Sequence, residues 1–86
     1  MSLYRIVLAH SAQKELEDLD PPIIQRLFPK LENLVNNPRP LGCVKLKGSR
    51  DLWRIRIGEY RAIYSIDDKN RVVDIICIRH RKDVYR

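Results

Sequence analysis

Residues 52–64 alternate between apolar and charged side chains in two runs, which Gly58 and Glu59 separate. A two-residue Gly-X loop is typical of a type II′ β-hairpin. This loop predicts a register with Arg56 opposite Arg61 and Trp53 opposite Tyr64. Because side chains alternate along a strand, the apolar residues fall on one face of the hairpin. The other face then carries Arg54, Arg56 and Arg61.

Two segments before the hairpin have apolar residues at three- and four-residue spacings, the pattern of an amphipathic helix. The first is predicted to start at Ser11, as its cap, and to run to about Leu19. The second follows Asp20-Pro21-Pro22, an acidic cap and two prolines at positions where no amide hydrogen is needed. Its apolar stripe runs from Ile23 to Val35, and the helix is predicted to end near Asn36-Asn37-Pro38.

The remaining apolar runs predict strands. Residues 3–8 form a short β-rich run, residues 43–46 allow a short extended piece, and residues 72–78 are apolar except for Asp74. The predicted order is β-α-α-β-β-β, an α+β fold with two N-terminal helices packed on one face of a mostly antiparallel four-stranded sheet. At 86 residues the whole chain, residues 1–86, is expected to be a single domain.

A turn at residues 67–70 is predicted to pair Ile66 with Arg71, and so to bring Ile76 opposite Arg61. Continued alternation places Ile76, Ile78 and His80 on the arginine face, and Val73, Ile75 and Cys77 under the helices. Three arginines and a histidine would then share the uncovered face, beside a tail that contains Arg81 and Tyr85. This set depends on register, because a slip of one residue moves every side chain to the other face.

The net charge of +6 is unevenly distributed. Residues 43–86 hold twelve of the seventeen basic side chains but only six acidic ones, so the entire excess lies there. This asymmetry indicates a nucleic-acid or acidic partner, with a merely solvated basic surface as the alternative. The sequence contains neither a membrane-spanning apolar run nor a signal-peptide pattern, so we expect a cytoplasmic protein whose two cysteines are packing residues.

The sequence lacks a metal-ligand motif and a glycine-rich phosphate loop, so no metal or other cofactor is expected. The arginines suit metal-free RNA cleavage, in which a ribose 2′-hydroxyl attacks the neighbouring phosphate and cations stabilise the developing charge. Arginine cannot act as the base, which leaves His80 and Tyr85 for proton transfer. Contacts with the RNA backbone are predicted for Lys45, Lys47, Arg50, Arg79 and Lys82. For every one of these residues a solvated or packing role is the plain alternative.

Four stretches together resemble the RelE/ParE superfamily of toxin–antitoxin toxins: Leu46-Lys47-Gly48, residues 52–56, residues 58–64 and the ending at residues 79–85. The resemblance implies a cytoplasmic toxin and a cognate antitoxin encoded by the adjacent gene. RelE-type members cut messenger RNA in the ribosomal A site without a metal. Their catalytic residues match Arg54, Arg56, Arg61, Arg81 and Tyr85, with arginines here at the first two positions where relatives have lysines.

The resemblance favours a ribosome-dependent mRNA endoribonuclease (an mRNA interferase) that inhibits translation. Two alternatives stay open: a ParE-like inhibitor of DNA gyrase without nuclease activity, and a basic RNA-binding module without catalysis. The antitoxin is expected to be an extended acidic or amphipathic segment that wraps the domain. It would neutralise the toxin by covering the arginine face or by displacing the tail.

Overall fold

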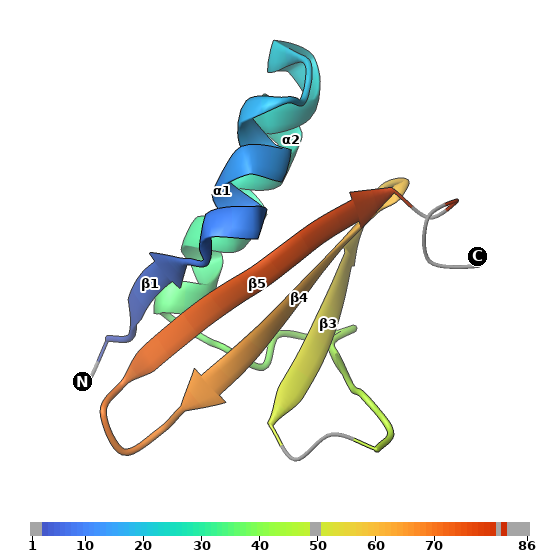
Figure 1. The fold of residues 1–86 in the computed structure, drawn as a ribbon. Coiled ribbons are helices and arrows are strands. Elements are labelled where there is room, and N and C mark those ends of the chain that lie inside the picture. The colour runs from blue at the N-terminus through green and yellow to red at the C-terminus, as the bar shows by residue number, and fades with distance from the viewer. Residues whose placement is uncertain (1–2, 49–50, 81, 83–86) are drawn as a thin grey trace.

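The computed structural model describes residues 3–48, 51–80 and 82, and it has the predicted α+β class (Figure 1). A sheet of five strands has the order β1-β5-β4-β3-β2. Its first strand runs parallel to β5 and the other neighbours are antiparallel. The elements are β1 (Arg5–Leu8), α1 (His10–Glu17), α2 (Pro21–Glu32), the 3₁₀ turn η1 (Asn33–Val35), β2 (Val44–Lys45), β3 (Leu52–Ile57), β4 (Tyr60–Asp67) and β5 (Val72–His80). The fifth strand is β2, which lies in the short extended piece suggested by the sequence.

The hairpin of β3 and β4 has the predicted register. Arg56 is opposite Arg61, and Trp53 is opposite Tyr64. Gly58 has a φ of 59°, and Glu59 is not among the positive-φ residues. A type II′ turn needs a positive φ at its first central residue only, which is the reason that glycine stands at this position.

The predicted register of β4 against β5 is wrong. Asp67 pairs with Val72 and Tyr64 with Ile75, and an irregularity between Ile63 and Tyr64 then brings Cys77 opposite Ile63. One extra residue on β5 at this point inverts the alternation for the rest of the strand. The side chains after the bulge therefore lie on the faces opposite to those predicted: Cys77 shares a face with the arginines, while Ile78 and His80 share the helix-covered face.

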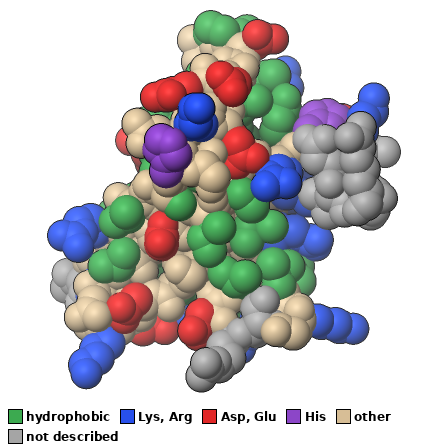
Figure 2. Space-filling view, viewed as in Figure 1, with side chains coloured by type: hydrophobic (Ala, Val, Ile, Leu, Met, Phe, Trp, Pro, Cys, Tyr) green, Lys and Arg blue, Asp and Glu red, His purple; other side chains and the backbone are tan. Residues whose placement is uncertain are grey.

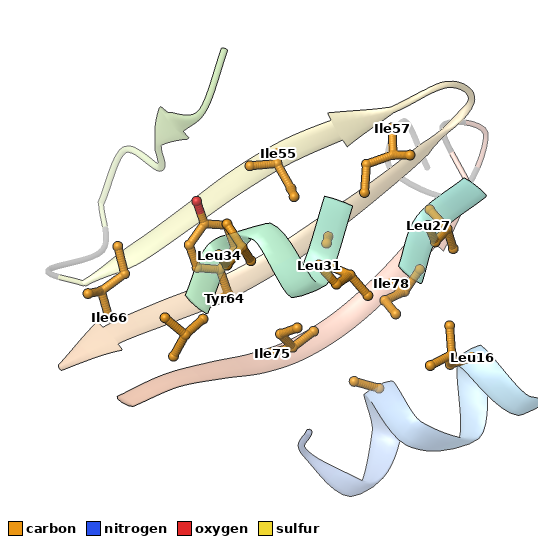
Figure 3. Close-up of a cluster of buried hydrophobic side chains, with 13 residues drawn as sticks. Leu16, Leu27, Leu31, Leu34, Ile55, Ile57, Tyr64, Ile66, Ile75 and Ile78 are labelled. Carbon is orange, nitrogen blue, oxygen red and sulfur yellow. The ribbon is translucent and has the colours of Figure 1, made fainter. Parts of the chain in front are cut away.

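The core lies between the sheet and the segment formed by α2 and η1 (Figure 3). Leu27 and Leu34 from that segment are 1% and 0% exposed, and Tyr64 and Ile75 from the sheet are both 0% exposed. The helix begins at Pro21, with Asp20 as its N-cap as predicted, and continues through Pro29. Because α2 and η1 cover one face of β3, β4 and β5, the charged residues of the hairpin lie on the opposite face.

Helix α1 lies along the edge of β5 where β1 has ended. Its N-cap is Ala9 rather than the predicted Ser11, and Ala9 N–H donates to the carbonyl of Ile75 at 2.9 Å. The Ser11 hydroxyl donates instead to the carbonyl of Ile76 at 2.8 Å. The α1 side chains therefore satisfy backbone groups of β5 that no strand pairs with, which protects the sheet edge.

Two polar contacts hold the loop after η1 against the sheet. The buried Tyr64 hydroxyl donates to the carbonyl of Pro38 at 2.7 Å. Both terminal nitrogens of Arg39 donate to Asp68 in the β4–β5 turn, at 3.1 and 2.9 Å, and the Tyr4 hydroxyl donates to the same carboxylate at 2.6 Å. The Arg39 guanidinium also lies 5.0 Å from the centre of the Trp53 ring.

Candidate nucleic-acid interface

Three arginines from three neighbouring strands lie side by side on the face of the sheet opposite α2. Arg61 on β4 is directly opposite Arg56 on β3 and directly opposite Arg79 on β5. Direct partners in an antiparallel ladder point to the same side, and neighbouring strands are about 4.8 Å apart. These three residues, called here the arginine row, form a line of positive charge at the hairpin end of the sheet.

Contacts of two members help to define the arginine row. The Nε of Arg56 donates to the carbonyl of Gly58 at 3.2 Å, which ties the side chain to the turn. The Nε of Arg79 lies 2.7 Å from Oε2 of Glu15 on α1. The other oxygen of Glu15 accepts the amide hydrogen of Ile78 at 3.0 Å. One carboxylate therefore fixes both the backbone and the side chain at this end of β5, while the Arg79 side chain stays 49% exposed.

Arg54 lies two residues before Arg56 and so about 7 Å further along the same face. Its ladder partner is Ile63, which is itself opposite Cys77, so the charged positions give way to apolar ones in the middle of the face. Burial raises the pKa of the Cys77 thiol, which keeps this neighbour of Ile63 uncharged. In the view of Figure 2, hydrophobic side chains likewise gather over the middle of the molecule, with both basic and acidic groups around them.

The far end of the same face carries charges of both signs, because Arg5 on β1 and Asp67 on β4 both lie opposite Val72. Asp74 lies opposite Ser65 on β4 and Val7 on β1. Its Oδ1 is buried and has no hydrogen-bond partner among the described residues. The hairpin end differs from this end, because there basic side chains lie directly opposite one another on three neighbouring strands.

The prediction that His80 lies on the arginine face is wrong. Because of the bulge, His80 is opposite Tyr60 and shares the helix-covered face with it. The two rings are in an edge-to-face arrangement with centres 5.1 Å apart. His80 Nε2 lies 3.5 Å from a carboxylate oxygen of Glu59, and the amide of Lys82 donates to Nδ1 at 3.2 Å.

The other predicted RNA contacts are dispersed. Lys45 is opposite Trp53 and so lies on the helix-covered face of the sheet, away from Arg54. Lys47 and Lys82 are exposed. Three predicted site residues, Arg50, Arg81 and Tyr85, lie outside the described residues. Within residues 3–48, 51–80 and 82, no three His, Cys, Asp or Glu side chains come together in a way that could hold a metal ion.

Sequence reasoning missed two parts of this arrangement. It treated Arg79 only as a general RNA contact, and it assigned no role to Glu15. The run Ile76-Cys77-Ile78 is apolar throughout, so nothing in its pattern marks the residue at which alternation inverts. A bulge without glycine or a polar residue has no local sequence signature that could have revealed it.

Comparison with known proteins agrees with this architecture. A family model for the ParE toxin of the type II toxin–antitoxin system parDE matches residues 6–85. Toxin RelE of Mycobacterium tuberculosis is 32% identical over 87 residues, which cover 96% of this chain and 87% of that protein. The RelE chain of the Pyrococcus horikoshii OT3 RelE–RelB complex superposes with a TM-score of 0.81 at 31% identity, covering 92% of this chain and 96% of that one. The intact E. coli RelBE complex gives a TM-score of 0.77 at 28% identity, covering 87% and 93%.

The chain therefore belongs to the RelE/ParE superfamily of type II toxins, and its named relatives above are RelE toxins. The two homologous structures above were crystallised with the antitoxin RelB. Within the described residues, no helix combines the length and the apolar character that crossing a membrane requires.

Proposed function

We propose that this toxin is a ribosome-dependent mRNA endoribonuclease that a cognate antitoxin restrains. The observation that carries the proposal is the arginine row, because like charges placed directly opposite one another destabilise a sheet. A bound phosphate compensates this repulsion, and guanidinium groups bind phosphate oxygens in a bidentate manner. The similarity to RelE toxins supports the same conclusion.

The chemistry requires no group beyond the RNA and the protein. The ribose 2′-oxygen loses its proton and forms a bond to the adjacent phosphorus. The bond from phosphorus to the 5′-oxygen breaks, and that oxygen gains a proton. The products are a 2′,3′-cyclic phosphate and a 5′-hydroxyl. The arginine row would neutralise the charge that grows on the non-bridging oxygens, and such electrostatic stabilisation is commonly worth 10²–10³-fold in rate.

The other predicted residues have separate roles in this proposal. Arg54, about 7 Å along the face, would hold a neighbouring phosphate of the same strand. Arg81 would add positive charge at the scissile phosphate. Tyr85 would transfer a proton or stack on an unpaired base. Because His80 lies on the other face, Tyr85 is the proton-transfer candidate that we retain. The proposed contacts with the RNA or ribosome remain Lys45, Lys47, Arg50 and Lys82.

Dependence on the ribosome follows from the open setting of the arginine row. An open sheet face would hold a flexible single strand in many orientations, whereas cleavage requires the 2′-oxygen, the phosphorus and the 5′-oxygen to be in line. The ribosome would supply this alignment, and precise orientation contributes a large part of many enzymatic rates. The proposed antitoxin is an acidic or amphipathic segment, which would compete for the basic face.

The test uses purified ribosomes programmed with a defined mRNA, with cleavage mapped by primer extension. We expect Arg61→Ala to reduce the cleavage rate by about 10²-fold or more. The matched control is Lys69→Ala, which removes a positive charge from the exposed turn at the opposite end of the sheet and should leave the rate unchanged. Equal rates for both variants would contradict the proposal. Intact mRNA together with gyrase-linked DNA breaks would identify the ParE-type alternative.

A further inference from the structure

A cavity of about 520 Å³ lies beside the open edge of β3, next to the arginine row. It is called here the edge cavity. Three parts of the chain line it: the junction of α2 and η1, the loop before β2, and the hairpin end of β3. Arg56 lines the edge cavity and is also a member of the arginine row, so a ligand bound at one of them extends naturally to the other.

Several of the residues that line the edge cavity are apolar. Ile55 and Ile57 lie on the helix-covered face of β3 and are 6% and 8% exposed (Figure 3). Pro40 and Leu41 of the loop before β2 line the same cavity, and Leu41 is fully exposed to solvent. Apolar side chains in such a position can pack against the face of an unstacked nucleobase.

The backbone of Arg56 provides one donor and one acceptor at the open edge. The carbonyl of Leu52 accepts the amide hydrogen of Leu46 at 2.9 Å, so Leu52 directs its backbone groups toward β2. Alternation along the strand gives Arg54 and Arg56 the same direction. Arg54 pairs with Val44, where β2 begins, whereas no described residue pairs with Arg56 on this side. The N–H and C=O groups of Arg56 can therefore bind a ligand.

Asn33 adds a side-chain amide to the edge cavity. The residue is exposed, and among the residues that the structure describes this amide has no hydrogen-bond partner. An asparagine amide both donates and accepts, as the edges of the bases do. Asn33 is also the C-cap of α2, and the negative end of a helix dipole disfavours a second phosphate there. A neutral group with donors and acceptors therefore suits this cavity better than an anion.

We propose that the edge cavity binds one nucleobase of the mRNA, next to the phosphate on the arginine row. This inference rests on the proposed function and deepens it, because it assigns a residue that determines base specificity. The edge of the base pairs with the side chain of Asn33 and the backbone of Arg56, while Pro40 and Leu41 pack against its face. Proteins generally recognise single-stranded RNA in this way, through unstacked bases whose edges are free.

An added peptide strand is the other occupant that an open sheet edge suggests, but the edge is too short for one. β2 occupies the edge beside Arg54, and the turn begins at Gly58. Arg56 is thus the one described residue of β3 that offers backbone groups here. Strand addition depends on a series of such hydrogen bonds, whereas one donor and one acceptor match the edge of a single base.

The first test measures kcat/KM for cleavage on programmed ribosomes whose mRNAs differ only in the bases on either side of the cut. Wild type should prefer one base at one of these positions by about fivefold or more, as expected for an amide that pairs with a base edge. Asn33→Ala should reduce this preference to about twofold or less, with an unchanged urea midpoint. A wild type without base preference, or a preference retained in Asn33→Ala, would overturn the inference.

The matched control is Asn36→Ala. Asn36 is an exposed asparagine at the end of η1 and does not line the edge cavity. This variant should keep the wild-type base preference and the wild-type rate. Loss of the preference in both variants would overturn the assignment of specificity to Asn33.

A second readout uses binding rather than cleavage. The full chain is titrated with four 2′-O-methyl trinucleotides that differ in the central base, and with one that lacks this base, and nitrogen-15 NMR follows the binding. At least one base-containing trinucleotide should shift the side-chain amide of Asn33 and the backbone amide of Arg56, and the abasic one should leave the Asn33 amide unshifted. Equal shifts with all five would overturn the inference. A glutamate-rich peptide that shifts the Arg56 amide when no trinucleotide does would also overturn it, in favour of strand addition. If base-dependent shifts occur but the chain cleaves no ribosomal mRNA, the proposed function fails and the base site stands.

Discussion

Arg61 of β4 lies directly opposite Arg79 of β5, so two positive charges face each other across the central ladder of the sheet. Arg56 lies opposite Arg61 on the other side and extends the same line. An arrangement selected for stability alone would place opposite charges across from one another or use apolar residues at these positions. Glu15 already offsets part of the charge of the row through its contact with Arg79 at 2.7 Å, and the row is the place where we propose that an anion binds.

This relationship predicts that a substitution of Arg61 lowers the cleavage rate much more than it changes the stability of the fold. Replacing it with threonine, a favoured strand residue, removes one charge from the row and relieves the like-charge opposition. We expect cleavage to fall by about 10²-fold while the free energy of unfolding changes by less than about 0.5 kcal/mol. Urea denaturation and ribosomal cleavage should be measured on the same preparation. A loss of more than about 2 kcal/mol would mean that Arg61 is chiefly a structural residue.

Glu15 provides a second prediction, because its carboxylate serves both Ile78 and Arg79. Glu15→Ala leaves the part-buried amide of Ile78 without its partner, and we expect a loss of about 1–3 kcal/mol in unfolding free energy. Glu15→Gln keeps an acceptor for that amide and removes the charge that pairs with Arg79. We expect it to be nearly as stable as wild type and to bind RNA more tightly, with a steeper dependence on salt. Weaker RNA binding by Glu15→Gln would contradict this account of Arg79.

A substitution of the Tyr64 hydroxyl is expected to change the stability of the fold and not the activity. Its side chain is fully buried, and its hydroxyl donates to the carbonyl of Pro38. Burial raises the pKa of the Tyr64 phenol, so the group remains a neutral donor. Tyr64→Phe should lower the unfolding free energy by about 1–2 kcal/mol because the carbonyl loses its partner. Cleavage measured well below the melting temperature should be unchanged, and a large loss of activity in a folded variant would show that the loop after η1 belongs to the site.

Asp68 predicts a pH dependence of stability. The hydrogen bonds from Arg39, and then from Tyr4, lower the pKa of its carboxyl to about 2. A folded-state pKa below the unfolded value of about 3.9 means that the contribution is fully present above that pH and is lost as pH falls toward 2. Asp68→Asn should therefore have a melting temperature that depends less on pH between about 4 and 2. A wild-type slope retained in the variant would exclude Asp68 as its source.

The parts of the fold that the sequence predicted are those that local chemistry determines. Gly58 and Glu59 set the hairpin loop, and so the positions of Arg56 and Arg61 followed directly. Asp20 and the two prolines defined the start of α2 in the same way. The class and the order of elements required only these local patterns together with the apolar runs.

The parts that were wrong depend on contacts distant in sequence. The Ser11 hydroxyl bonds to β5 instead of capping its own helix, because it lies beside a backbone carbonyl that no strand satisfies. The β5 bulge moves His80 off the arginine face and leaves Arg79 there, yet Ile76, Cys77 and Ile78 look alike in a hydrophobic pattern. Registry beyond such a bulge is set by α1, β1 and β4 together, and no single segment of the sequence encodes it.

The most direct test of the central claim, that the arginine row holds a phosphate under attack by its own ribose, is the chemistry of the cut ends. In the first arm, ribosome-bound mRNA is incubated with the wild-type chain, and the downstream fragments are treated with polynucleotide kinase. In the second arm, the mRNA carries a 2′-deoxyribose at the cleavage position. The account predicts 5′-hydroxyl ends that the kinase labels without prior phosphatase, and no cleavage of the 2′-deoxy substrate. Fragments with 5′-phosphate ends, or cleavage at the 2′-deoxy position, would contradict it.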